Sequence, residues 1–408
     1  MNLRVVILLT MLVGLASKGG YAQSFGIEVF NNLMPASGGM AGASTAAPQD
    51  LQSAINGNPA TLTQYSGTQF GLGGAWIEPT YSLAVADPGL IFVSPFEAKS
   101  DAQGIAAPNI GVTQDFNAWG LPVTMGLGLM AGSGAGVDFR EVPASRGTYA
   151  SLVALDIIAG AGVQLTERLS CGASLILSNA TMGGPFVGNT SSSIDYALRG
   201  SLGLGYQLTP DTSLGLYWKS KASYTFENLV GFPIPGAYFD IAADRPQSVG
   251  LGIANQSLLD GRLLLAMDAV FQQYSETAMF GDLFNDQWAV QLGAQYALTD
   301  RVRLRLGYAW NENPMRDSVG DRLSGFPAGA AQVQYIEALF AAIPQDRITG
   351  GVSVRDVLPG IDWDLFAGGM FEHSQTFGIT TATVASYWVG TGITWRFGRG
   401  GCAEDECK

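Results

Sequence analysis

The chain carries little charge for its length. Asp, Glu, Lys and Arg make up 13% of the 408 residues, while hydrophobic residues make up 47%; ordinary soluble domains carry about 25% charged residues. A soluble protein of this size would therefore be poorly solvated. The net charge of −13 leaves no basic surface to neutralise phosphates, which excludes a nucleic-acid-binding protein.

Long apolar runs are also missing. No uninterrupted run reaches the roughly 18 residues that a membrane-spanning helix needs, which excludes transmembrane helices. The first 22 residues instead predict a secretory signal, with Arg4 in the n-region, an apolar stretch over residues 5–16 and a small-residue cleavage site at residues 20–22. No cysteine follows to take a lipid. We expect the mature chain to be exported through a bacterial inner membrane.

Cysteine and histidine are scarce. Cys171 lies in a predicted strand as a small apolar residue, while Cys402 and Cys407 could close a small disulfide or, less simply, hold a metal. His373 is the sole histidine, and an acyl-transfer site would need it. No Gly-x-Ser-x-Gly elbow accompanies it. We therefore predict no enzyme, no cofactor and no catalytic metal.

The sequence does contain segments in which apolar and polar residues alternate with a period of two. From residue 69 to 397 we count about fourteen strand candidates joined by tight turns and longer loops. In residues 286–311, Trp288 and Leu292 share one face of a predicted hairpin, while Gln291 and Arg305 fall on the other. The pattern predicts an all-β fold, a transmembrane antiparallel β-barrel, because a closed barrel exposes apolar side chains to lipid and leaves no edge unpaired.

The longer connections would lie outside the cell, and two of them, around residues 90–96 and 229–239, are unusually apolar for a surface. They cover residues 82–101, 133–146, 229–244 and 314–343, with a short amphipathic helix predicted over residues 335–342. We predict that the large side chains of two of these loops capture a hydrophobic ligand: Phe92, Phe96, Phe232, Ile234, Tyr238 and Phe239. The alternative is that these loops pack on each other over the mouth of the barrel.

Residues 25–61 form a segment of small residues with neither helical nor strand periodicity. It cannot form a core of its own. Ahead of a strand series, such a segment indicates a plug threaded into the barrel, or alternatively a disordered linker.

Several short motifs resemble the FadL family of outer-membrane transporters. The resemblance lies in residues 24–27, residues 37–42, Asp50, the Asn58-Pro59-Ala60 motif, the first strand at residues 70–79, residues 307–315 and the ending at residues 389–397. It implies a hatch at residues 23–67 inside a fourteen-stranded barrel at residues 68–397. A tail at residues 398–408 is a departure, because barrels of that family commonly stop at the terminal aromatic, here Phe397.

The same resemblance implies a function. It is passive uptake of hydrophobic compounds, with long-chain fatty acids ahead of aromatic hydrocarbons. The protein would be a monomer in the bacterial outer membrane, in contact with its lipid and lipopolysaccharide. A polar-solute porin and a non-transporting barrel whose apolar loops bind a surface partner are the alternatives.

Alternation places several cations in the lumen: Arg199, Lys219, Lys221, Arg303 and Arg305. One of them could meet a substrate carboxylate, or they could form a structural ladder of ion pairs. In the FadL family substrate leaves sideways at a kinked third strand. Here that strand is predicted at residues 121–131, which contain Pro122, Gly126 and Gly128. We expect Asn58, Pro59 and Ala60 to lie inside the barrel close to it.

Overall fold

The computed structural model describes residues 27–87, 90, 92–184, 191–230, 239–316 and 330–397. The predicted signal, the tail with Cys402 and Cys407, and the predicted capture residues Phe232, Ile234 and Tyr238 lie outside the described residues. No helix in the described ranges is long and apolar enough to cross a membrane.

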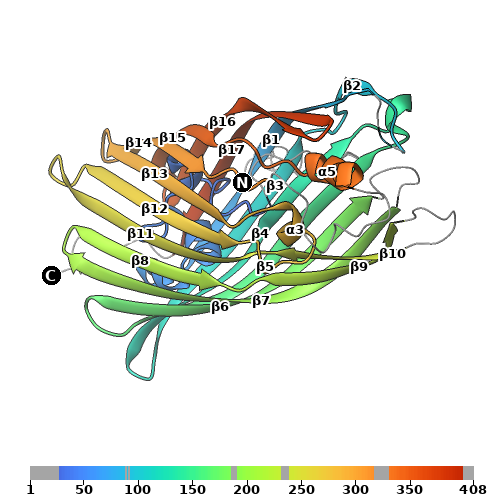
Figure 1. The fold of residues 1–408 in the computed structure, drawn as a ribbon. Helices are drawn as coiled ribbons and strands as arrows, with labels where there is room; N and C mark the ends of the chain where they lie inside the picture. The colour runs from blue at the N-terminus through green and yellow to red at the C-terminus, as the bar shows by residue number, and fades with distance from the viewer. Residues whose placement is uncertain are drawn as a thin grey trace, which may run out of the picture.

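Fourteen strands form one closed antiparallel sheet, because the last strand pairs with the first along its whole length (Figure 1). In ring order they are β1 (Gln69–Val85), β3 (Ile105–Ala118), β4 (Leu121–Asp138), β5 (Tyr149–Gln164), β6 (Leu169–Gly184), β7 (Ser191–Thr209), β8 (Thr212–Lys219), β11 (Gln247–Leu258), β12 (Leu263–Gln273), β13 (Gln287–Ala297), β14 (Val302–Asn311), β15 (Asp346–Leu358), β16 (Ile361–Phe377) and β17 (Thr380–Arg396). The prediction of a fourteen-stranded barrel is confirmed.

Further short elements lie at the end of the barrel with the longer connections. β2 (Phe96–Lys99) pairs with the outer end of β1. β9 (Ala222–Val230) and β10 (Phe239–Arg245) pair with each other and continue β8 and β11 beyond two breaks, at residues 220–221 and at Pro246. Among the described residues, the helices at this end are η3 (Pro143–Ser145), α3 (Phe280–Leu283) and α5 (Ala330–Leu339). The helix predicted over residues 335–342 therefore begins five residues earlier and ends at Leu339.

The predicted alternation of faces holds in the barrel wall. On β13 and β14, Trp288, Leu292 and Leu306 are exposed on the outside, whereas Gln291 and Arg305 are buried inside. The turn between these strands keeps the register, with the Thr299 amide donating to the Val302 carbonyl. The exposed apolar side chains give the barrel an exterior suited to hydrocarbon.

Residues 27–67, hereafter the hatch, lie inside the barrel at the end with the tight turns (Figure 1). They contain η1 (Ser37–Met40), α2 (Leu51–Asn56) and η2 (Pro59–Gln64). Almost every hatch residue up to Leu62 is buried. This placement agrees with the interpretation of a plug rather than a linker.

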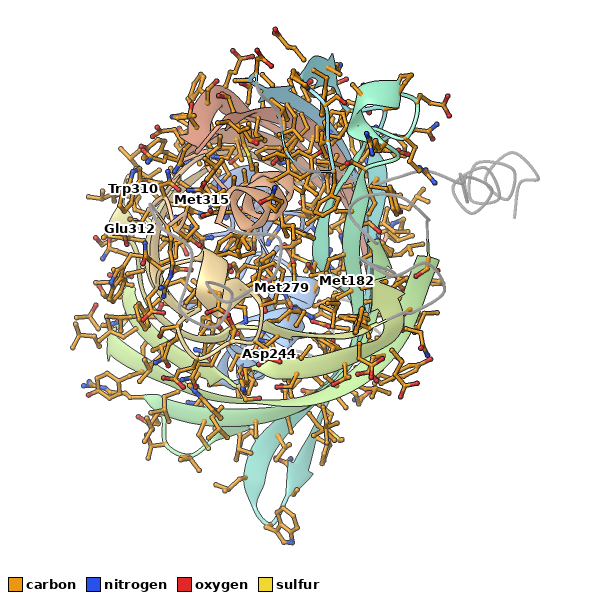
Figure 2. The ribbon with its side chains drawn as sticks, turned by 45° about the vertical axis from the view of Figure 1, so that its right-hand side comes forward. Met182, Asp244, Met279, Trp310, Glu312 and Met315 are labelled. Carbon is orange, nitrogen blue, oxygen red and sulfur yellow. The ribbon has the colours of Figure 1, made fainter. Side chains whose placement is uncertain are left out.

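The other half of the lumen is filled by apolar side chains, hereafter the outer cluster. They come from the outer ends of the strands, from α3 and α5, from the segments next to these elements and from the first residue of the hatch: Ile27, Tyr81, Phe139, Met182, Phe226, Tyr274, Phe280, Tyr335, Phe340 and Phe377 among them. In Figure 2, α5 (orange) lies across the mouth of the barrel with Met315 beside it. The lumen is thus plugged by the hatch at one end and filled by the outer cluster at the other.

Candidate functional site

The hatch folds by local capping rather than by a core of its own. Asp50 is the N-cap of α2, where Oδ1 accepts from the Ser53 amide at 2.7 Å. Its Oδ2 accepts from the amides of Ala36 and Ser37 at 3.0 and 2.8 Å, so one carboxylate joins α2 to η1.

The Asn58-Pro59-Ala60 motif joins the hatch to the barrel wall. Pro59 occupies the first position of η2, where the missing amide hydrogen costs nothing. The Asn58 side-chain amide donates to the carbonyls of Thr45 in the hatch and Leu204 in β7, at 3.0 and 2.9 Å. The motif lies inside the barrel as expected. Its closest approaches to the wall are at Gly172 of β6 and Gly203 of β7, and η2, which the motif begins, reaches β4 where Leu62 lies against Gly126.

We expect Asn58→Ala to loosen the hatch without unfolding the barrel. The change leaves the buried carbonyl of Thr45 and the partly buried carbonyl of Leu204 without these donors, at a cost of about 1–3 kcal/mol. Hydrogen exchange of the Gly57 amide, which donates to the Ser53 carbonyl in the wild type, should accelerate accordingly. Asn117→Ala, at an exposed position of β3, is the control. Equal exchange in the two variants would contradict this role.

Glycines of the wall allow the hatch backbone to approach closely. A Cβ on Gly215 of β8 would lie 2.6 Å from the Thr45 carbonyl carbon, and one on Gly172 of β6 would lie 2.5 Å from the Ala60 nitrogen. Similar approaches occur at glycines spread around the inner wall: Gly203, Gly293, Gly307, Gly351 and Gly392. Side chains at these positions would exclude the hatch.

Polar wall side chains hold the hatch backbone between these glycines. Asp268 of β12 accepts from the amides of Ser44 and Thr45 at 2.7 and 2.8 Å. Lys219 of β8 donates to the Asn56 carbonyl at 2.8 Å. These contacts place one predicted lumen cation, Lys219, against the hatch.

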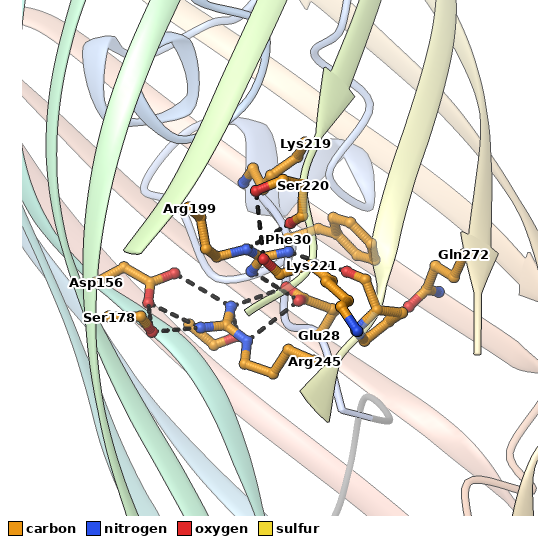
Figure 3. Close-up of polar contacts among 12 residues, drawn as sticks. Glu28, Phe30, Asp156, Ser178, Arg199, Lys219, Ser220, Lys221, Arg245 and Gln272 are labelled. Carbon is orange, nitrogen blue, oxygen red and sulfur yellow. Dashed lines mark hydrogen bonds and ion pairs between the residues drawn. The ribbon is translucent and has the colours of Figure 1, made fainter. Parts of the chain in front are cut away.

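A buried network of ion pairs holds the beginning of the hatch (Figure 3). The Glu28 carboxylate accepts from Arg199 of β7 at 2.9 Å and from Arg245 of β10 at 2.9 and 3.1 Å. Arg245 also donates to Asp156 of β5 at 2.8 and 3.1 Å. All four charged side chains are at most 3% exposed. A hatch carboxylate is thus fixed to two different parts of the wall.

The sequence alone did not reveal Glu28 or Arg245 as part of this network. A usable signal existed, since Glu28 is the only charged residue between Lys18 and Asp50. A single charge in an otherwise uncharged buried segment needs a partner.

The neighbouring arginines control the ionisation of Glu28. Burial raises the pKa of its carboxyl, but Arg199 and Arg245 lower it more, so the pKa lies below its ordinary value. A carboxyl whose pKa is depressed in the folded state stabilises that state above the unfolded pKa, about 4.3, and the contribution is lost as the pH falls through the folded pKa.

We therefore expect the contribution of Glu28 to the protection of neighbouring hatch amides from hydrogen exchange, corrected for intrinsic rates, to be fully present above about pH 5 and to be lost below about 4. The Val29 amide, which donates to the Gly132 carbonyl at 3.2 Å, is the natural reporter. In Glu28→Gln the same amide should lose this acid-dependent step. An identical step in both proteins would assign the effect to another carboxyl.

The barrel wall is interrupted beside the hatch. β3 pairs with β4 only from Asn109 and Met130 toward the tight turn, and β4 has a bulge between Ala131 and Ser133. The gap opens on a cavity of about 50 Å³ that is lined almost entirely by apolar side chains. These side chains come from the hatch, β1, β3, β4 and β5, and include Val29, Leu33, Ile77, Ile105, Ala107, Ala131 and Val153. The expected opening at the third strand thus lies at the Ala131 end of residues 121–131. Pro122 is at the opposite end, next to the turn, and Gly126 and Gly128 approach the hatch residue Ile55.

The described capture residues are only partly exposed. Phe92 and Phe96 pack against the outer cluster, with the rings of Phe96 and Phe139 5.8 Å apart. Phe239, at the start of β10, is 48% exposed. For Phe92 and Phe96 the structure shows loop packing, which leaves capture by them a proposal.

The predicted lumen cations differ in their surroundings. Arg305 is buried and pairs with Asp364 at 3.0 Å, and Arg199 is in the network of Glu28. Arg303 is half-buried near the tight-turn end of β14. Lys221 is not in the lumen: its side chain is 47% exposed and pairs with Asp244 at 3.1 Å, because the break after β8 turns it away from the inner face.

Comparison with known proteins identifies the fold. A family model described as an outer membrane beta-barrel porin, MtrB/PioB, matches residues 149–336. No curated protein sequence matches the chain. Among solved structures, a FadL homologue of Pseudomonas aeruginosa is similar with 14% identity and a TM-score of 0.68, covering 93% of this chain and 100% of that one.

Two toluene transporters are similar in the same way. TodX of Pseudomonas putida has 18% identity and a TM-score of 0.65, over 93% of this chain and 99% of that one. TbuX of Ralstonia pickettii has 18% identity and a TM-score of 0.63, over 90% and 99%. The chain therefore has the fold of these outer-membrane β-barrels.

Proposed function

We propose that this chain, an outer-membrane β-barrel with the fold of the FadL-type channels, takes up hydrophobic compounds passively. The observation that carries the proposal is the apolar cavity in the wall between β3 and β4. It is closed on the inside by Val29 and Leu33 of the hatch, so that movement of the hatch would connect the outer cluster with the membrane.

The two halves of the lumen support a hydrophobic cargo. Burial of each CH2 group is worth about 0.8 kcal/mol, so an apolar molecule gains by entering the outer cluster from water. A polar solute gains nothing there and meets the hatch beyond it. This arrangement favours a hydrophobic channel over a porin for polar solutes.

Transport also fits the chain better than catalysis. The His373 ring nitrogen Nδ1 lies 3.2 Å from the Phe371 carbonyl on the same strand. Within the described ranges no hydrogen bond joins this ring to a serine or a carboxylate. An outer-membrane esterase therefore lacks the constellation it would need there.

Among hydrophobic compounds we place long-chain fatty acids ahead of aromatic hydrocarbons. The apolar outer cluster suits both classes, and the buried arginines beneath it suit a carboxylate. The toluene transporters among the similar structures support the second class. We expect the protein to act as a monomer, because hatch and barrel belong to one chain.

Uptake of labelled oleate and toluene by cells lacking their own channels for these compounds tests the proposal. Expression of this protein should accelerate uptake of at least one of them. If a folded barrel in the outer membrane accelerated neither, the proposal would be wrong and binding of a surface partner by the apolar loops would be favoured.

Ala131→Phe should close the lateral route. Ala131 lines the cavity, and the larger side chain would more than fill its 50 Å³. We expect uptake to fall by about tenfold, since an overpacked gap costs about 1–3 kcal/mol to reopen. Ala173→Phe, on the lipid-facing side of β6, is the matched control. Undiminished uptake in Ala131→Phe would rule out this route.

A further inference from the structure

Four arginines gather on the inner face of the barrel at the end with the tight turns. They are Arg303 and Arg305 of β14, Arg355 of β15 and Arg396 at the end of β17, hereafter the rim arginines. In the ladder Arg303 is opposite Ser353, so Arg355 lies diagonally beside it on the same face of the neighbouring strand. This cluster is separate from the ion pairs that hold the beginning of the hatch.

Two of the rim arginines already have carboxylate partners. Arg305 pairs with Asp364 of β16 at 3.0 Å. Arg396 pairs with Asp356 of β15 and Asp362 of β16, at 2.7 and 2.9 Å. The three carboxylates beside the cluster are thus shared between these two arginines.

The other two, Arg303 and Arg355, make no ion pair and no side-chain hydrogen bond within the described ranges. Both are only partly exposed. Asp362 and Asp364 attract them, but these carboxylates are bound to the other rim arginines, and Arg303 is also repelled by Arg355 and Arg305. Four arginines against three carboxylates leave a positive charge at the rim, which a further anion would neutralise.

The sequence contains a matching anion a few residues beyond β17. Glu404, Asp405 and Glu406 follow one another in the segment of residues 398–408. Nowhere else in the 408 residues are two acidic residues adjacent. The most concentrated negative charge of the chain is therefore attached to the strand that carries Arg396.

The segment is long enough to reach the unpaired arginines. The Phe397 amide donates to the Thr68 carbonyl at 2.9 Å, which fixes the point where the segment leaves the barrel. In the sheet, β17 is separated from β14 by β16 and β15. Three spacings of about 4.8 Å amount to roughly 15 Å, whereas the chain from Phe397 to Glu404 spans up to about 23 Å when extended.

We propose that residues 398–408 dock on the rim of the barrel, where the carboxylates of Glu404, Asp405 and Glu406 pair with Arg303 and Arg355. The contact is intramolecular, so the tether holds the carboxylates at an effective concentration on the order of millimolar. The docked segment closes the rim beside η1 of the hatch, since a Cβ on Gly39 would lie 3.4 Å from the Arg305 Cβ. This inference does not depend on the proposed function or on its cargo.

Cleavage of the purified, detergent-solubilised protein by a Glu-specific protease tests the docking. Reducing buffer keeps Cys402 and Cys407 as thiols, and mass spectrometry follows cleavage after Glu404 and Glu406. A docked segment is cut only when it is released, so the rate reports the released fraction. Replacing both arginines, Arg303→Met together with Arg355→Met, should accelerate cleavage by about tenfold, because methionine retains much of the volume and none of the charge.

The matched control is Arg168→Met. Arg168 is exposed at the tight turn between β5 and β6, elsewhere on the same rim. Cleavage in this variant should match the wild type. Equal acceleration in the control and the double variant, or no acceleration in either, would overturn the inference.

A second measurement uses the wild-type chain and does not depend on a variant folding. Salt screens ion pairs at an accessible rim, so cleavage after Glu404 should accelerate by about tenfold between about 0.05 and about 1 M NaCl. A synthetic peptide of residues 398–408, cut under the same conditions, corrects for the effect of salt on the protease. If the protein and the peptide were cut equally fast at low salt, the segment would not be docked and the inference would be wrong.

Discussion

Gly215→Val is expected to open the barrel to small polar solutes. Gly215 lies in the middle of β8, opposite Gly205 of β7 and Gly252 of β11, so three glycines form a flat area of inner wall. The hatch backbone at Thr45 rests on it, and a Cβ on Gly215 would lie 2.6 Å from the Thr45 carbonyl carbon and 2.9 Å from the Ala46 Cα. Neither backbone atom can rotate away.

The wall itself should tolerate the change, because valine is favoured in strands and the ladder of β8 is untouched. The hatch must therefore move. Overpacking of this kind costs about 1–3 kcal/mol, which lowers the ratio of seated to displaced hatch by roughly 10- to 100-fold. Conductance of the reconstituted protein in planar bilayers measures this displacement.

The matched control is Gly200→Val in β7, because a Cβ at Gly200 has nothing within 4 Å. It introduces the same side chain into the neighbouring strand without touching the hatch. We expect this control to conduct like the wild type. Equal conductance in both valine variants would show that wall glycines do not seat the hatch.

The sequence predicted the barrel because its features are local. Alternation along residues 286–311 fixes which side chains face lipid, and tight turns such as residues 298–301 fix the register of neighbouring strands. The hatch was predicted for a related reason, since its small residues cannot bury enough apolar surface alone. Such features need no knowledge of contacts distant in sequence.

The contacts between hatch and wall were not predictable in this way. Asn58 meets Leu204, and Glu28 meets Arg245, across 146 and 217 residues of chain. Alternation with a period of two predicts that a side chain faces the lumen, but it does not predict which residue that side chain contacts there. Lys221 was wrongly assigned because the strand breaks beside it, at Ser220, whose carbonyl accepts a hydrogen bond from Arg199.

The largest loss of hatch stability is expected from Arg245→Met. The side chain joins Glu28 of the hatch, Asp156 of β5 and the Gly132 carbonyl at the bulge of β4. Methionine preserves much of the volume but none of the donors. Two buried carboxylates then face one arginine fewer, and removing one partner of a buried pair costs about 3–5 kcal/mol.

This loss should appear at the hatch rather than in the barrel. Amides that open by local unfolding of the hatch, such as Gly38 and Gly42, should exchange with solvent at least about 100-fold faster, whereas amides in the ladders of β13 and β14 should not change. Arg140→Met is the control, because Arg140 pairs with Asp138 at a position where its side chain is 41% exposed. Exposed pairs are worth about 0–1 kcal/mol, so exchange of the hatch in that variant should match the wild type. Unaltered exchange of Gly38 and Gly42 in Arg245→Met would mean that the ion pairs of Glu28 do not retain the hatch, and that its seating depends on the wall glycines and on Asp268 instead.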